Sequence, residues 1–491
     1  MLKKIKGFLT ENSTSRQTIV KNAFWIGFGN IFGRVIRGIF VIYAARILGA
    51  ADYGVFSYAL GLAAFFTIFG DLGISGVFIR ETSKNPERAD EYFSVAFIIK
   101  ILFSFLAALL LIVSAPFISN IQEVRVLLPL VALLIIGDNI QNFFIAVFRV
   151  KEHMELEAFV VLITNIIITL SGFIILKIHP TVHALTFTYI SAVFLGSLPT
   201  FFMVKKELLN IFKSFKKNLI GPFLSAGTPF ALQGVFGGLM LNTDMLILGW
   251  MRTTQEIGIY SAGQRIIYIL YLLPTILAGS IFPILSRFIG KKEQEKTQVL
   301  IEKTMSILFS IAIPLTVGGI ILSTPILSFL FGIEYISGAL SFQFLIATVI
   351  FVFPLSILIN ITFANNQQGR FLFFTVIAAI TNLILDVIFI RLWGIAGCSL
   401  ATLLVQIIYT TLTWRFVRKY YIFSVIKYLK KVVLASIIMG LFSLTLNYIF
   451  NLHILITITI SIIIYFITLY ILKEPIIKEI VQIFKPNQIK N

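Results

Sequence analysis

The sequence is poor in the residues that form disulfide bridges, metal centres and water-exposed surfaces. It contains one cysteine, Cys398, so no disulfide can close within a chain, and its four histidines lack the spacing of metal ligands. Only 13% of its residues are charged, whereas about a quarter are charged in soluble proteins. No glycine-rich loop of the Walker type is present. These absences exclude a soluble globular protein and argue against an enzyme or a nucleotide-driven pump, and we expect neither a catalytic centre nor a cofactor.

Apolar and basic residues dominate what remains. Hydrophobic residues make up 58% of the 491, and the formal net charge is +18. Proteins that bind nucleic acid group their basic residues on a polar or aromatic surface, but here the basic residues separate long apolar runs. We therefore expect a polytopic membrane protein with no nucleic-acid partner. Residues 1–21 lack the apolar core and cleavage site of a signal peptide, so we expect them to stay attached, as a solvated tail or a short interfacial helix.

Apolar runs of the length that a bilayer needs, about 20 residues per helix, follow one another along the chain. We place about fourteen of them, near residues 22–44, 54–74, 92–114, 126–148, 157–176, 183–204, 222–250, 258–284, 304–323, 338–361, 371–390, 395–414, 428–449 and 453–472. The connections on one side carry nearly all the lysines and arginines, and those on the other side carry only Arg46, Arg125, Lys177, Arg252 and Arg391. The positive-inside rule then predicts that both termini are cytoplasmic, in a multi-pass protein of the cell (plasma or inner) membrane.

Two pairs of similar segments indicate an internal repeat. The stretch LGAADYGVFSYALG, near the second span, aligns with MRTTQEIGIYSAGQ, near the eighth, when Gly54 is set against Gly258. A second pair, ITNIIITLSGFII and ITNLILDVIFI, begins at Ile163 and Ile380. Because each half then has six spans, the halves share one orientation and are related by an axis along the membrane normal. Chance similarity between apolar helices is the alternative.

The predicted fold is therefore an all-α polytopic membrane protein with about fourteen transmembrane helices. It has two six-helix lobes in a parallel pseudo-twofold repeat, plus two extra C-terminal helices. We divide the chain into a cytoplasmic N-terminal segment 1–21, an N-lobe 22–204, a cytoplasmic linker 205–221, a C-lobe 222–418, spans thirteen and fourteen 419–472, and a cytoplasmic tail 473–491.

Four basic residues fall inside the predicted spans: Arg34, Arg37, Lys100 and Arg265. A charge at the bilayer centre costs at least about 2.5 kcal/mol, so such residues face a cavity or a partner. Arg34 and Arg37 share one helical face, and guanidinium forks match the geometry of phosphate. We therefore predict that they bind a pyrophosphate-type anion in a water-filled cavity, whose cationic wall Lys100 and Arg265 extend.

The sequence also allows other positions for these basic residues. The two arginines can form buried ion pairs with Asp71 or Asp138, or extend toward an interface of the membrane. Lys100 and Arg265 can instead lie near the ends of their helices.

Three polar residues inside the C-lobe have a different chemistry: Asp244, Asn382 and Asp386. Asn382 and Asp386 are four residues apart and share a helical face, and Ser399 and Thr402 follow on the next helix. Carboxylate, amide and hydroxyl oxygens suit a small cation such as sodium. The alternative is a polar network that holds three helices together.

Three stretches resemble one membrane-protein family: AARILGAADYGVFSYALGL from Ala44, GDLGISGVFIRE from Gly70 and LWGIAGCSLAT from Leu392. In their order, and in the number of spans around them, they resemble the oligosaccharide flippases of the Wzx type. These belong to the multidrug/oligosaccharidyl-lipid/polysaccharide exporter superfamily. The resemblance implies that a polyprenyl-pyrophosphate-linked glycan moves from the cytoplasmic to the outer leaflet by alternating access of two lobes. Its further partners are the lipid bilayer and glycan-assembly enzymes.

A relative in that superfamily, the lipid II flippase of peptidoglycan synthesis, implies a cation site. Its sodium site lies in the C-terminal lobe, and the positions that match here are Asp244, Asn382, Asp386 and Thr402, with Cys398 where a backbone carbonyl contributes. The resemblance also implies that spans thirteen and fourteen form a groove for the lipid tail. No motif indicates which glycan is carried.

Two other functions are alternatives. A cation-coupled multidrug exporter of the same superfamily usually has about twelve spans and acidic residues in its cavity, whereas this chain has a cationic first span. A membrane-embedded glycan polymerase or glycosyltransferase needs an acidic catalytic group in a sizeable outer loop, and the outer connections here are short.

Overall fold

The computed structural model describes residues 15–474 of the 491. Every regular element in this range is a helix, and no strand occurs in it. Most of the predicted cytoplasmic segments, 1–21 and 473–491, lies outside the described residues. The expected all-helical architecture agrees with the structure.

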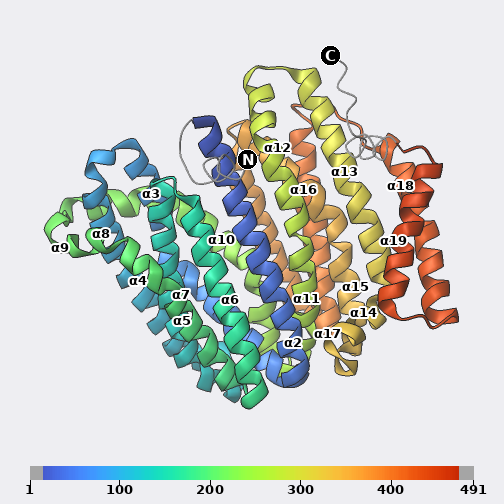
Figure 1. The fold of residues 1–491 in the computed structure, drawn as a ribbon, viewed down its shortest axis with the longest axis horizontal. Helices are drawn as coiled ribbons and strands as arrows, with labels where there is room; N and C mark the ends of the chain where they lie inside the picture. The colour runs from blue at the N-terminus through green and yellow to red at the C-terminus, as the bar shows by residue number, and fades with distance from the viewer. Residues whose placement is uncertain (1–14, 475–491) are drawn as a thin grey trace, which may run out of the picture. The chain divides into compact units, whose positions relative to one another are not determined.

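The helices are, in chain order, α2 (Ser15–Asp71), α3 (Ile74–Lys84), α4 (Ala89–Ile118), α5 (Gln122–Val150), α6 (Met154–Ile178), α7 (Val182–Met203), α8 (Lys205–Leu209), α9 (Ile211–Ser214), α10 (Ile220–Met251), α11 (Thr254–Leu270), α12 (Leu272–Gly290), α13 (Gln294–Ile321), α14 (Ser323–Phe331), α15 (Ala339–Ala347), α16 (Val349–Ala364), α17 (Gln368–Val417), α18 (Ile426–Leu444) and α19 (Ile454–Ile471) (Figure 1). Short 3₁₀ turns lie at η1 (Pro86–Arg88), η2 (Lys217–Leu219) and η3 (Ile333–Gly338), and η4 (Thr445–Ile449) is a π-helical turn.

Twelve helical segments within residues 15–474 are long and apolar enough to cross a membrane, by length and composition. Two of them, Phe24–Lys84 with 61 residues and Gln368–Val417 with 50, are far longer than one crossing, which needs about 20 residues. Within α2 and within α17, a glycine joins two helices at a kink. Gly49 has φ 75° and ψ 172°, and Gly394 has φ 61° and ψ −138°. Glycine occupies these positions because a positive φ is strained for any residue with a Cβ.

The chain forms two compact units. The first consists of Met1–Ala262 with Asn382–Gly394, and the second of Gly263–Thr381 with Ile395–Asn491. Helices α11 and α17 therefore contribute residues to both units.

Close helix packing in the first unit depends on small residues. Helix α2 packs along α6, α6 along α7, and α4 along α5 (Figure 1). Helix α10 also packs on α2, where a Cβ added to Gly249 would lie 1.9 Å from the ring of Tyr58 and one added to Gly238 would lie 1.8 Å from Ile68. Small residues let helix backbones approach closely, which is the main source of helix association in a lipid environment.

The two glycines that the repeat aligns contact each other in the first unit. A Cβ on Gly54 would lie 1.8 Å from the carbonyl oxygen of Thr254, and a Cβ on Gly258 would lie 1.9 Å from that of Ala50. Each carbonyl belongs to the residue four positions before the opposing glycine, so the contact is reciprocal.

The second unit is built around α13. This helix packs on α16 and α18, and α18 forms an antiparallel pair with α19 (orange to red in Figure 1). Tyr465 of α19 donates a hydrogen bond of 2.6 Å to the carbonyl of Ser310 in α13. An apolar cavity of about 400 Å³ opens between these helices, and Pro314, Met439 and Phe466 are among its lining residues.

Candidate functional site

A polar cavity of about 420 Å³ lies in the first unit where α2 ends and α3 begins. The chain breaks there because Leu72 has φ 39° and Gly73 has φ 79°. Asp71 stabilises the break: its carboxylate accepts hydrogen bonds from the Gly73 amide at 3.2 Å, the Ser75 amide at 3.4 Å and the Ser75 hydroxyl at 2.5 Å. A carboxylate next to the first turn of a helix satisfies amide groups that have no partner within that helix.

Lys100 of α4 reaches the same point from the protein interior. Its ammonium group forms an ion pair with Asp71 and donates a hydrogen bond of 3.1 Å to the Ser75 hydroxyl. The Lys100 side chain is 1% exposed, whereas the Asp71 side chain is 35% exposed. The buried charge is therefore paired, as a lysine at membrane depth requires, and the carboxylate is the partner that faces the cavity.

One face of α5 supplies most of the remaining polar lining. Asn139, Asn142 and Arg149 are spaced by three and seven residues, so they share this face. Asn139 donates hydrogen bonds to the carbonyls of Thr67 at 3.2 Å and Ile135 at 3.0 Å, which ties α5 to the end of α2. Arg149 forms two hydrogen bonds with Glu157, at 2.6 and 2.8 Å.

The two arginines of the first span have different surroundings. The Arg37 guanidinium lies 5.0 Å from the ring centroid of Tyr189 and interacts electrostatically with Asp138. Arg34 is exposed, and within residues 15–474 it forms no hydrogen bond and no ion pair. Among the described residues Arg37 and Asp138 interact electrostatically without an ion pair, and Asp71 is paired with Lys100 instead.

The four basic residues that we predicted as one cationic wall have separate settings. Lys100 lies in the polar cavity, Arg37 lies against α7, and Arg34 is exposed. Arg265 lies in the part of α11 that belongs to the second unit and is half-buried. The role of these four residues in binding an anion stays a prediction.

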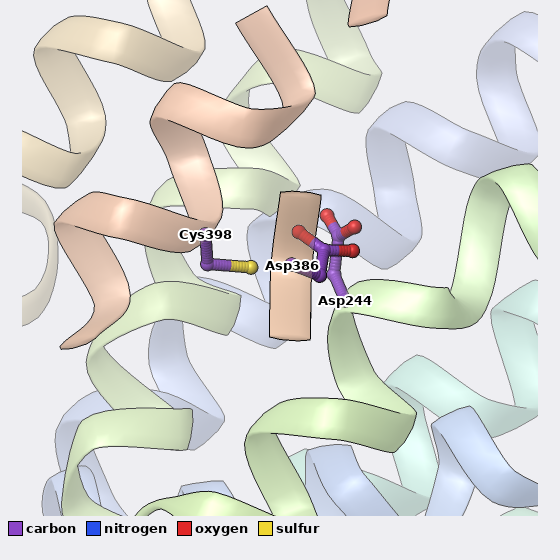
Figure 2. A group of neighbouring side chains, drawn as sticks. All are labelled: Asp244, Asp386 and Cys398. Atoms are coloured by element: carbon purple, nitrogen blue, oxygen red, sulfur yellow. The ribbon is translucent and has the colours of Figure 1, made fainter. Parts of the chain in front are cut away.

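The first unit brings Asp244 of α10 close to Asp386 of α17. One carboxylate oxygen of each lies within 4.8 Å of one of the other, and Figure 2 shows the two carboxylates side by side. Both residues are buried, at 4% and 0% exposure. Two buried carboxylates this close repel each other unless a cation or a proton lies between them.

Two further side chains orient this pair. Asn382 donates a hydrogen bond of 2.9 Å to Asp386 from the preceding turn, and the Tyr260 hydroxyl of α11 donates one to Asp244. Arg252, after the end of α10, donates hydrogen bonds to the carbonyls of Ile390 and Arg391. The helices that carry the two carboxylates are thus fixed to each other near the Gly394 kink.

Cys398 and Thr402, the other residues predicted for the cation site, belong to the second unit. Cys398, also drawn in Figure 2, is buried. Its carbonyl accepts a hydrogen bond of 3.1 Å from the Thr402 hydroxyl. The carbonyl that the resemblance named as a ligand therefore already has a local hydrogen-bond donor.

Sequence reasoning missed Tyr260, Asn142 and Arg149. Tyr260 had a signal, because the repeat alignment sets it against Phe56 and only the hydroxyl distinguishes the two rings. Arg149 lies in a basic connection, where the positive-inside pattern explains it without a cavity. Asn142 has no signal in a single sequence.

Comparison with solved structures identifies the fold. The structure is similar to the inward closed conformation of the lipid II flippase MurJ, with a TM-score of 0.76 and 20% identity over 91% of this chain and 98% of that one. It is also similar to an inward-facing multidrug resistance transporter of the MATE family in the MOP superfamily, with a TM-score of 0.63 and 14% identity over 80% and 94% of the two chains. The chain therefore has the all-helical, multi-pass membrane fold of these two structures.

Sequence comparison identifies the family. Residues 19–289 match the family described as "Polysaccharide biosynthesis protein", and residues 229–392 match the MatE family. A "Probable low-salt glycan biosynthesis flippase" of Haloferax volcanii is 26% identical over 391 residues, which cover 79% of this chain and 80% of that protein. The chain belongs to the polysaccharide biosynthesis protein family. The resemblance to Wzx-type flippases is thereby confirmed, and the chain is a membrane flippase or transporter and not an enzyme.

Proposed function

We propose that this protein moves a polyprenyl-pyrophosphate-linked oligosaccharide from the cytoplasmic to the outer leaflet by alternating access. The observation that carries the proposal is the presence of two cavities of opposite character, one polar in the first unit and one apolar beside α18 and α19 in the second. A substrate with a sugar head and a lipid tail needs both kinds of surface. The similarity to a probable glycan biosynthesis flippase of Haloferax volcanii supports a glycan-containing substrate.

The proposed topology has fourteen crossings in the cell membrane, with both termini cytoplasmic. The kinks at Gly49 and Gly394 support it, because each divides an over-long helix into two crossings. We retain the predicted division into an N-lobe 22–204, a linker 205–221, a C-lobe 222–418 and two further spans within 419–472. The reciprocal contact of Gly54 with Gly258 supports the pseudo-twofold relation of the lobes.

We further propose that Asp244 and Asp386, oriented by Tyr260 and Asn382, hold a sodium ion that couples to transport. The repeat alignment that sets Gly54 against Gly258 sets Asp244 against Phe40. Phe40 packs on Phe173 with ring centroids 5.5 Å apart, so an aromatic contact is sufficient to join helices at the corresponding place. A polar network is therefore not needed to hold these helices together. Burying two carboxylates without a ligand between them also costs free energy.

The pyrophosphate is proposed to bind Arg34 and Arg37 of the first unit. The contribution of Lys100 and Arg265 to anion binding stays a prediction from the sequence. The exposed Arg34 guanidinium has the donors of a bidentate anion site available. Assembly enzymes that make the lipid-linked glycan on the cytoplasmic side are the expected partners.

A cation-coupled multidrug exporter is the second candidate, because residues 229–392 match the MatE family. The polysaccharide family covers the larger range, 19–289, and includes the basic first span, which is unfavourable for cationic drugs. We therefore prefer the glycan flippase.

The test is complementation of bacterial strains that each lack one defined glycan flippase. Lipid-linked intermediates are measured on each leaflet, and export of cationic dyes is measured in the same strains. Restored transfer to the outer leaflet in at least one strain is expected. Dye export without glycan transfer in any strain would favour the drug exporter instead.

A further inference from the structure

We propose that the polar cavity between α2, α3, α4, α5 and α10 binds the sugar end of the substrate, with Asn142 and Phe230 as the residues that contact it. This inference rests on the proposed flippase function. It separates the sugar from the pyrophosphate, which is assigned to the arginines of the first span.

The charges of the cavity are balanced internally. Lys100 is paired with Asp71, and Arg149 is paired with Glu157. An anionic ligand would have to compete with a carboxylate for either cation, and removing one partner of such a pair is strongly unfavourable. A neutral ligand with many hydroxyl groups makes hydrogen bonds to these pairs without breaking them, because a hydroxyl both donates and accepts.

Hydrogen-bonding groups face the cavity from several helices. Asn142 lines it and is exposed, and among the described residues it forms no hydrogen bond. Its amide therefore offers two donor hydrogens and one acceptor oxygen to a ligand. The side chains of Asp71 and Arg149, which are 35% and 46% exposed, line the same cavity. Alternating donors and acceptors of this kind match the hydroxyls of a sugar ring.

An aromatic wall closes the cavity on the α10 side. The ring of Phe230 lies over Gly76, where an added Cβ would be 3.3 Å away, and the Phe230 Cβ lies 2.5 Å from the position of a Cβ on Gly73. The Phe230 side chain is 37% exposed, and the Arg80 guanidinium of α3 lies 5.6 Å from its ring centroid. Part of this ring is therefore accessible in the cavity that it lines. A sugar has an apolar face of C–H groups that packs on such a ring, while its hydroxyls point to the polar side.

The volume fits this class of ligand. About 420 Å³ lies within the usual range of small-molecule sites, about 300–1,000 Å³. A cavity of this size holds one or two sugar rings and leaves the rest of the glycan outside. The cavity has too many polar groups for a lipid tail. A metal ion is also disfavoured, because Asp71, the one carboxylate that lines the cavity, is already paired with Lys100.

The test compares two ligands on the purified full-length protein: polyprenyl pyrophosphate, and the same lipid carrying the glycan of the strain that the protein complements. Asn142→Leu and Phe230→Leu are the variants. Asn120→Leu is the matched control, because Asn120 is also exposed but lies just before α5 and outside the cavity lining. Each variant is first checked for a monodisperse gel-filtration profile.

We expect both cavity variants to weaken binding of the glycan-bearing lipid about tenfold, the effect of about one lost hydrogen bond or ring contact, and to leave binding of the sugar-free lipid unchanged. The control variant should bind both lipids like the wild type. Equal weakening for both lipids would assign the cavity to pyrophosphate, and unchanged binding of both would remove it as a binding site. Either result would overturn this inference while complementation by the wild type still supports the flippase.

Discussion

Gly54 and Gly258 meet backbone to backbone, and each lies beside the carbonyl that precedes the other by four residues. A side chain at either position would overlap a carbonyl oxygen that cannot rotate away. Under the proposed repeat, this is the place where corresponding segments of the two lobes touch.

Alanine at Gly54 or Gly258 should reduce glycan transfer. Overpacking of this kind costs about 1–3 kcal/mol in the conformation that contains the contact, which shifts a conformational equilibrium by about 5- to 150-fold. Transfer is measured in the complemented strain, with protein abundance in the membrane measured in parallel. Gly237→Ala is the control, because a Cβ on Gly237 meets no atom within 4 Å. Wild-type transfer in both variants would mean that the contact has no part in the transport cycle.

The ion pair of Asp71 and Lys100 should respond unequally to removal of its partners. Asp71→Asn leaves the buried ammonium without its counter-ion, so we expect a loss of about 3–5 kcal/mol. Lys100→Met leaves a carboxylate that faces the cavity, so the loss should be smaller. The double variant should recover most of the stability. Thermal unfolding of the purified protein measures all three, and the opposite order of the single variants would contradict the burial difference described above.

Arg34→Ala should abolish glycan transfer with little effect on folding, because Arg34 contacts no described polar group. Arg37→Ala should lose transfer and some stability, since Arg37 also packs on Tyr189 and interacts with Asp138. Lysine should restore only part of the activity at either position because it lacks the bidentate fork. Leaflet-resolved measurement of lipid-linked glycan is the assay. Normal transfer by both alanine variants would end the proposal of an anion site in the first span.

Sodium should raise the melting temperature of the purified protein, and Asp386→Asn should remove this effect. A ligand that binds only the folded state stabilises it by an amount that rises with the logarithm of its concentration above the Kd, and the site loses one of its two carboxylates in the variant. Potassium chloride at equal concentration controls for ionic strength, and Asp52→Asn, which changes an exposed carboxylate, controls for the loss of one acid. If sodium stabilises Asp386→Asn as much as the wild type, the site is elsewhere.

A thiol introduced at Lys213 should be protected from a membrane-impermeant reagent in intact cells, whereas one at Thr253 should react. Both residues are exposed, and the proposed topology places them on opposite sides of the membrane. Permeabilised cells should label both. Labelling of the Lys213 variant in intact cells would contradict the cytoplasmic linker.

The sequence was sufficient for the class of fold because bilayer thickness imposes long apolar helices, and the family followed from short motifs in a fixed order. It also located the ionisable residues at membrane depth, since these are rare and costly. Their partners did not follow from the sequence. Asp71 pairs with Lys100 of α4 and not with an arginine of the first span. The break at Leu72 and Gly73 ends α2 at Asp71, where its carboxylate meets α4.

The polar cavity could not be predicted from the sequence either. Its walls come from segments of several helices that are distant in the chain, and the glycines at positions 73 and 76 let α3 pack closely on Phe230 at its edge. A periodic pattern describes the face of a helix, but it carries no information about where two helix ends stop short of each other.

Cys398 is the one cysteine of the chain, and it is buried. A buried thiol is poorly accessible to labelling reagents, so the natural chain should react little with spin labels and fluorophores. Pairs of cysteines introduced one on each unit therefore report on their own positions alone. Distance distributions between such labels, measured with and without sodium or lipid-linked glycan, give the movement of the two units in a protein that keeps its native sequence everywhere else.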